Sequence, residues 1–207
     1  MKLLCPKAPD GLSHAVNEAV ARLNLRQLVG DEDVRSIIPA VPHRVYSIHK
    51  RNLRSARRFS MARSSSWLVF LLLNGHQPVA AVSVHGRARK MRARAIHPGF
   101  PGPDVLETVA LAEAAEAGLS STYEFRLLII PTTQTIAIWL HGPKDDFFLP
   151  VTPSPREFVR KRLYTSTEFT SALFAFLHRH IASRKALRKS SVGFETRKLP
   201  HPVRNRT

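Results

Sequence analysis

Asp104, Glu124 and Arg126 are the residues of this chain whose types and spacing come nearest to a metal-dependent active site. Asp104 follows a Gly-Pro pair, and the other two stand two apart in the largely apolar stretch STYEFRLLIIP, residues 121–131. Two carboxylates can hold a divalent metal ion while a nearby cation positions water or stabilises developing negative charge. This combination would suit the cleavage of phosphodiester bonds.

These residues are loosely similar to the metal-binding set of PD-(D/E)xK nucleases, with two departures. Asp104 is expected to open a helix, whereas the Asp of that motif lies on a strand. Arg126 stands where the motif has Lys, and a guanidinium group is effectively never deprotonated in proteins. The alternation of Glu124 and Arg126 with apolar residues is typical of the solvent face of a strand. We therefore interpret the pair as a polar strand face. A metal-dependent nuclease with Asp104 and Glu124 as ligands is an alternative.

The ten histidines do not form a recognisable metal-binding pattern. His178 and His180 stand two apart on an expected helix, where their side chains diverge by about 200°. His85, His97 and His141 each lie near the end of an expected strand, and three imidazoles can bind zinc. No His-x-x-x-His pair supports such a zinc site. The sequence therefore predicts no metal, no cofactor and no catalytic residue.

Positive charge is the strongest signal in the composition, with 32 Lys and Arg against 15 Asp and Glu and a formal net charge of +17. The excess lies in three segments: His43–Arg63 carries +7, Arg87–Arg94 carries +5 and Arg184–Thr207 carries +7. Subtracting them leaves −2 for the rest of the chain. Such a distribution is the electrostatic footprint expected for a polyanion partner. A host whose proteins are generally rich in Arg is the alternative explanation.

We expect the arginines of the first two basic segments to contact phosphates, because guanidinium offers several donors and its contacts release counterions. The aromatic residues among them are limited to Tyr46 and Phe59, so base stacking has few candidates. We therefore favour a non-enzymatic protein that contacts the backbone of DNA or RNA. The alternative is an interaction or scaffold module that docks an acidic partner protein. The predicted nucleic-acid-binding residues are Arg51, Arg54, Arg57, Arg58, Arg87, Arg89, Arg92 and Arg94.

Cys5 is the only cysteine, so the chain forms no internal disulfide. Only three residues separate it from Met1, too few for the apolar region of a signal peptide, which is about 7–15 residues long. The longest apolar run, Trp67–Leu73, has seven residues, whereas a membrane-spanning helix needs about 20. The sequence therefore predicts a cytoplasmic location and no membrane span.

Two hairpins are the clearest elements of the predicted fold. The first joins Trp67–Leu73 to Pro78–His85 through a turn that contains Asn74-Gly75. That dipeptide suits a turn with positive φ angles. The second hairpin joins YEFRLLII to TIAIWLHG through the turn PTTQ, residues 131–134.

Shorter strands extend these hairpins. The sequence Lys-Met-Arg-Ala-Arg-Ala, residues 90–95, has a period of two, which points its cations to one face and its apolar residues to the other. FFLPV, residues 147–151, adds a short edge strand limited by its proline. The preceding Asp145-Asp146 pair is interpreted as a solvated turn. Segment 43–63 fits either an amphipathic basic helix or a short strand, RVYSI, followed by a loop.

Helices are predicted from Ser13 to Val29, from Asp104 to Ala117, and from the capping box Thr165–Glu168 to Ser183. Antiparallel strands with helices packed on them are the economical arrangement of these elements. The predicted fold class is therefore α+β, with a mainly antiparallel sheet of five to six strands built from the two hairpins. The predicted parts are an N-terminal helix and connector at 1–42, a basic amphipathic segment at 43–66, an α+β core domain at 67–183 and a disordered basic tail at 184–207.

Overall fold

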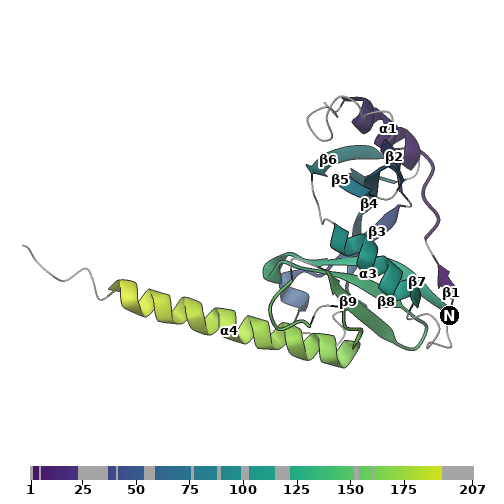
Figure 1. Ribbon diagram of the computed structural model, residues 1–207. Helices are drawn as coiled ribbons and strands as arrows, with labels where there is room; N and C mark the ends of the chain where they lie inside the picture. The colour runs from purple at the N-terminus through teal and green to yellow at the C-terminus, as the bar shows by residue number, and fades with distance from the viewer. Residues whose placement is uncertain are drawn as a thin grey trace, which may run out of the picture.

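A computed structural model describes residues 2–4, 6–22, 37–40, 42–53, 59–75, 77–87, 90–98, 103–114, 122–151, 154–159 and 161–192. The strands of these segments form one mixed, mostly antiparallel sheet of ten strands, with helices on its faces (Figure 1). The elements are β1 Lys2–Leu4, α1 Leu12–Arg22, β2 Ile37–Pro39, β3 His43–Ser47, η2 Lys50–Asn52, β4 Arg63–Leu73, β5 Gln77–His85, β6 Arg92–Pro98, α3 Pro103–Ala114, β7 Thr122–Ile130, η4 Pro131–Thr133, β8 Thr135–His141, β9 Asp146–Val151, β10 Tyr164–Thr165 and α4 Ser166–Val192.

Strand β3 joins two antiparallel arrays, β4–β5–β6 and β7–β8–β9–β10, in the order β10-β9-β8-β7-β3-β4-β5-β6. It pairs antiparallel with β4 and parallel with β7, where Val45 lies opposite Leu127. On the N-terminal side of His43, where β3 begins, the neighbouring strands β4 and β7 diverge. Strand β2 then lines the same edge of β4, and β1 lines the same edge of β7. The sheet is therefore forked at His43, with one array in each lobe of Figure 1.

Both predicted hairpins are confirmed. Asn74 and Gly75 have φ angles of 51° and 79° in the β4–β5 turn, as the dipeptide requires. In the β7–β8 turn, η4 is followed by Gln134 with a φ of 52°. The capping box is also confirmed, because the Glu168 carboxylate accepts from the Thr165 amide at 2.9 Å while the Glu168 amide donates to Thr165 Oγ1 at 3.3 Å.

Alternating side chains divide the core between the two faces of the sheet. Val45, Leu68 and Phe125 belong to a cluster that α3 covers with Val105. Their neighbours along the strands point to the opposite face, where α4 covers the β7–β9 array and α1 covers the β4–β6 array. This face therefore has a helix at each end and a stretch of β3 and β7 between them.

The structure differs from the sequence prediction in the size and limits of its elements. The sheet is larger than five to six strands, because short β1, β2 and β10 and the parallel β3–β7 pair add to the hairpins. Of the two predictions for segment 43–63, the short strand is confirmed at residues 43–47, at the centre of the sheet, whereas β4 already begins at Arg63, inside the predicted basic segment. Helix α4 continues to Val192, past the predicted tail boundary at 184. Residues 193–207 lie outside the described residues, as do 23–29 of the first predicted helix and 115–117 of the second. Within the described chain, we find no helix long and apolar enough to cross a membrane.

Candidate functional site

The sheet brings the first two basic segments to the same end of neighbouring strands. Arg63 begins β4, His85 ends β5 and Arg92 begins β6, and these three strands are successive antiparallel neighbours. Two strand spacings and about three residues along a strand separate Arg63 from Arg92, which is on the order of 15 Å. Segments about 30 residues apart in sequence therefore meet at one end of the sheet.

Arg63 and Arg92 also leave the same face of the sheet. Arg63 is paired with Ser47, which stands two residues after Val45 of the cluster under α3. Arg92 is paired with His85 and lies between Met91 and Ala93, which pack under α1 on the other face. Both guanidinium groups therefore lie on the α3 side, where each arginine is exposed.

A small basic cavity lies beside Arg63, where the chain leaves β3. Its volume is about 170 Å³, and it forms where Ile48 and Leu53 anchor the chain in the core while η2 turns outward. The Asn52 amide donates to the His49 carbonyl at 2.8 Å and fixes this turn. The cavity is lined by Ser47, Ile48, His49, Arg51, Asn52, Met61, Arg63 and Pro131. Two guanidinium groups, an imidazole and an amide thus surround a space suited to an oxyanion.

The turn between β5 and β6 holds further exposed cations in place. The Lys90 amide donates to the Arg87 carbonyl at 3.0 Å, and Gly86 has a φ of 129°. A Cβ atom on Gly86 would stand 2.2 Å from the Lys90 carbonyl oxygen, so only glycine fits this turn. Arg87 and Lys90 are therefore presented by a turn whose geometry depends on Gly86.

Four of the eight predicted nucleic-acid-binding residues lie in the described part of the chain. Arg51 lines the cavity, Arg87 is exposed in the β5–β6 turn, and Arg92 and Arg94 are exposed on β6. Between Asp33 and Asp104 the sequence contains no Asp or Glu, so no carboxylate interrupts these segments. The other predicted residues, Arg54, Arg57, Arg58 and Arg89, lie outside the described residues. Sequence reasoning left out Arg63 and His49, although both stand in the predicted basic segment.

A β-bulge at Arg94 changes the predicted face pattern of β6. Val84 is paired with Ala93 and Ser83 with Ala95, so Arg94 is the extra residue. Met91 and Ala93 pack under α1 before the bulge, and Ile96 does so after it. Ala95 therefore does not share the face of Met91 and Ala93, contrary to the period of two. A bulge re-aims a side chain at an edge strand, and here it turns Arg94 toward α1.

Glu124 and Arg126 form a partly buried ion pair on β7. Arg126 Nη2 donates to Glu124 Oε2 at 2.5 Å, and the two side chains are 14% and 28% exposed. The guanidinium carbon lies 4.5 Å from the centre of the Tyr46 ring and 4.7 Å from that of Trp139. Burial, above all, raises the pKa of the Tyr46 phenol. Arg126 is therefore enclosed by the Glu124 carboxylate and by the rings of Tyr46 and Trp139. This arrangement indicates a structural role.

The nuclease alternative is not supported by the positions of its residues. Glu124 alternates with Tyr123 and Phe125 of the cluster under α3, so its side chain leaves the opposite face. Asp104 lies on α3 itself, across the sheet. In the part of the chain that the structure describes, no three His, Cys, Asp or Glu side chains are grouped closely enough to hold a metal ion. Helix α3, which carries Asp104, therefore covers the face of the sheet opposite to the one that Glu124 leaves.

A histidine–aspartate pair stands next to Glu124 in the sheet. Glu124, His141 and Asp146 are in register across β7, β8 and β9. Asp146 Oδ1 lies 2.6 Å from His141 Nδ1 and accepts from Trp139 Nε1 at 2.8 Å. Which of the two atoms donates in the contact between His141 and Asp146 depends on the tautomer of the imidazole ring. Asp146 is thus the first residue of β9, and its partly buried carboxylate accepts from Trp139. This corrects its interpretation as part of a solvated turn.

His43 lies at the fork of the sheet, between an aromatic ring of each diverging strand. The imidazole centre is 5.4 Å from that of Phe70 on β4 and 4.9 Å from that of Phe125 on β7. Burial lowers the pKa of His43 from 6.5 to about 4. At neutral pH it is therefore an uncharged part of the core.

Comparisons of the chain with protein-family models, with curated protein sequences and with solved structures find no match. The function proposed below therefore depends on the residues and geometry alone.

Proposed function

We propose that the protein binds nucleic acid through the phosphate backbone, without catalysis and without reading bases. The observation that carries this proposal is the meeting of two carboxylate-free basic segments at one end of β4, β5 and β6. The proposed contact residues of this basic end come from the two basic segments and are His49, Arg51, Arg63, Arg87, Lys90 and Arg92.

The spacing of the basic end suits several phosphates of one strand. Phosphates follow each other by about 3.4 Å along one strand of duplex DNA. A separation on the order of 15 Å between Arg63 and Arg92 therefore spans about four to five nucleotides. The cavity beside Arg51 and Arg63 would receive one phosphate, and Arg87, Lys90 and Arg92 would contact others.

The contact residues of the basic end are basic and include no Phe, Tyr or Trp side chain, which favours binding of nucleic acid without sequence preference. The exposed residues of the basic end are cations, and Met61 is the large apolar residue that accompanies them, 41% exposed at the cavity. Binding of single strands generally uses aromatic rings on which bases stack, whereas contacts to phosphates carry no direct sequence information. We therefore expect the protein to bind duplexes of different sequence with similar affinity.

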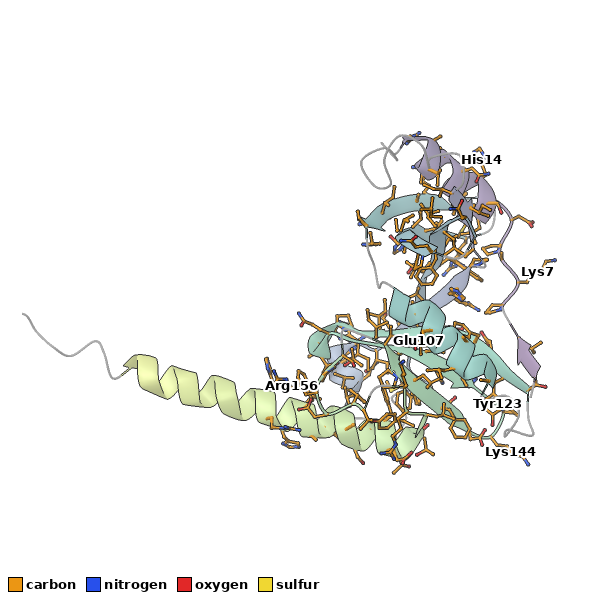
Figure 2. The ribbon with its side chains drawn as sticks, viewed as in Figure 1. Lys7, His14, Glu107, Tyr123, Lys144 and Arg156 are labelled. Carbon is orange, nitrogen blue, oxygen red and sulfur yellow. The ribbon has the colours of Figure 1, made fainter. Side chains whose placement is uncertain are left out.

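Salt titration of binding tests this proposal. Each neutralised phosphate contributes about 0.9 to the slope of log affinity against log salt on duplex DNA. Replacing Arg51 and Arg63 by Gln should therefore flatten the slope by about 1.8, and should do so equally on two unrelated duplexes. The matched control is Lys144→Gln, which removes an exposed cation from the β8–β9 turn (Figure 2). This turn follows β8, whereas Pro131 of the cavity precedes it.

The control and a second measurement separate the possible outcomes. Lys144→Gln should leave the slope unchanged, and circular dichroism melting should show that both proteins are folded. A flat salt titration of the wild-type protein would overturn the nucleic-acid proposal. The second candidate, docking of an acidic partner protein on the same cations, would then stand first.

A further inference from the structure

A groove lies between α1 and β6, away from the cavity of the basic end. Its volume is about 660 Å³. One side is a single stripe of α1, and the other is a stretch of β6 from Met91 to Ile96. Small-molecule sites in proteins measure about 300–1,000 Å³, so this groove has the size of a ligand pocket. Its lining residues are His14, Ala15, Glu18, Ala19, Arg22, Met91, Arg92, Ala93, Arg94, Ala95 and Ile96.

The groove exists because small residues face each other where the helix lies on the sheet. Helix α1 is anchored by Leu12 and Val16, which are buried in the same cluster as residues of β4, β5 and β6. Ala15 and Ala19 turn toward β6, where Ala93 stands opposite. A methyl group on each side leaves space that larger side chains would fill. The floor of the groove is therefore apolar and unfilled, with Met91 at one end.

The rim of the groove is cationic. Arg22 is paired with Glu18 one turn earlier on α1, and His14 lies at the other end of the helix stripe (Figure 2). Arg94 is exposed and has no ion pair among the described residues, and Arg92 lines the groove from β6 although its side chain leaves the α3 side of the sheet. The bulge adds Arg94 to the strand at this point. Guanidinium groups bind carboxylates and phosphates through paired hydrogen bonds, so an anionic group at this rim would be favoured.

We propose that this groove binds a small amphipathic anion, with its apolar body on the alanine floor and its single anionic group on Arg94. The cavity volume, the apolar floor and the cationic rim support this class of ligand over a neutral or cationic one. A polar nucleic-acid strand fits less well, because its sugar and phosphate groups would lie on methyl groups. The groove shares Arg92 with the basic end but contains neither Arg51 nor Arg63.

Fluorescence titration with 8-anilinonaphthalene-1-sulfonate tests the proposal, because this probe combines an apolar aromatic body with one sulfonate. We expect saturable binding of one probe per chain and its displacement by decanoate. Arg94→Gln should weaken probe affinity roughly tenfold, because it removes a charge-assisted contact on the exposed rim. Ala19→Leu should also abolish binding by filling the floor.

Two controls keep this test decisive. Lys144→Gln should bind the probe as the wild type does, and Arg51→Gln with Arg63→Gln should also leave probe binding unchanged. The latter result would separate the groove from the basic end, so either proposal can fail alone. Probe binding that does not saturate, or that survives both Arg94→Gln and Ala19→Leu in folded protein, would overturn the groove proposal.

Discussion

Helices α1 and α4 cover the same face of the sheet with different side chains. Under α4 the buried residues include many rings: Tyr46, Phe59, Trp139, Phe148, Phe158, Tyr164 and Phe169. Under α1 the buried residues of the described cluster are Ala, Leu, Val and Met, with no ring among them. Phe148 packs against both Phe59 and Phe169, with each ring centre 4.5 Å from its own. Rings fill the first region, whereas methyl groups leave a groove in the second.

This difference indicates that the two regions of the sheet have different roles, one in stability and the other in binding. Each buried aromatic side chain removes more apolar surface from water than an alanine, and ring pairs add a further contribution. The α4 region is therefore expected to supply most of the stability of the fold. The α1 region, with its alanines and its exposed arginines, is free to provide space and charge for binding.

The largest expected effect comes from removing a ring of the α4 region. Phe169→Ala should lower the free energy of unfolding by about 3–5 kcal/mol, because it leaves a large cavity against Phe148. The matched change under α1, Val16→Ala, should cost about 2 kcal/mol, since only two methyl groups are lost. Urea unfolding followed by circular dichroism measures both values.

The shape of these unfolding curves sharpens the comparison. If both helices cover one cooperative core, each variant shifts a single transition. Two separate transitions in Val16→Ala would mean that the α1 region unfolds by itself. Equal costs for the two variants would contradict the proposed concentration of stability under α4.

An effect of intermediate size is expected from pH at the fork between the two regions. The pKa of His43 is about 4 in the folded protein and 6.5 in an unfolded chain. Between these pH values the imidazole binds a proton in the unfolded chain but not in the folded protein. Its contribution to stability is fully present above pH 6.5 and is lost as pH falls toward 4. The loss is about 3 kcal/mol at most, at 1.36 kcal/mol per pKa unit. His43→Phe should lack this loss while keeping the ring contacts.

Thermal melting of wild type and His43→Phe at several pH values between 4 and 7.5 checks this expectation. The carboxyl groups are the same in both proteins, so the difference between their pH profiles isolates His43. Parallel profiles would mean that His43 is already solvated in the folded protein.

The smallest expected effect concerns the ion pair between the two helix-covered regions. Glu124→Gln should cost about 1 kcal/mol, because the amide oxygen still accepts from Arg126 but the charge of the partly buried guanidinium is no longer balanced. Glu107→Gln is the control, since its pair with Lys161 is more than half exposed and should contribute little. Nucleic-acid affinity should not change in Glu124→Gln. Metal-dependent cleavage that disappears in this variant would revive the nuclease alternative.

Local sequence signals predicted the parts of the fold that neighbouring residues decide. Asn74-Gly75 requires a turn with positive φ, and Thr165–Glu168 contains both partners of its cap, so these features do not depend on the rest of the chain. The pairing of Val45 with Leu127 has no such local signal. Strands of two or three residues, such as β10, are also too short to show a period.

The candidate sites show the same limit. The charge of the two basic segments was visible in the sequence, but their meeting depends on the register of β4, β5 and β6. His141 and Asp146 were considered separately, because only strand pairing places them side by side. The groove beside α1 had no sequence signal apart from alanines, which are ordinary in helices. The bulge at Arg94 breaks the period on which its predicted face depended.

The fork at β3 has a consequence for the order in which the chain folds. Hairpins β4–β5 and β7–β8 close short loops, whereas Val45 and Leu127 are 82 residues apart in sequence. Extending a loop from about ten residues to about 80 adds roughly 1.8 kcal/mol of closure entropy. We therefore expect the parallel β3–β7 pair to form late and to limit the rate of refolding. Until then the edges of β4 and β7 are unpaired, which makes the partly folded chain prone to associate with other copies.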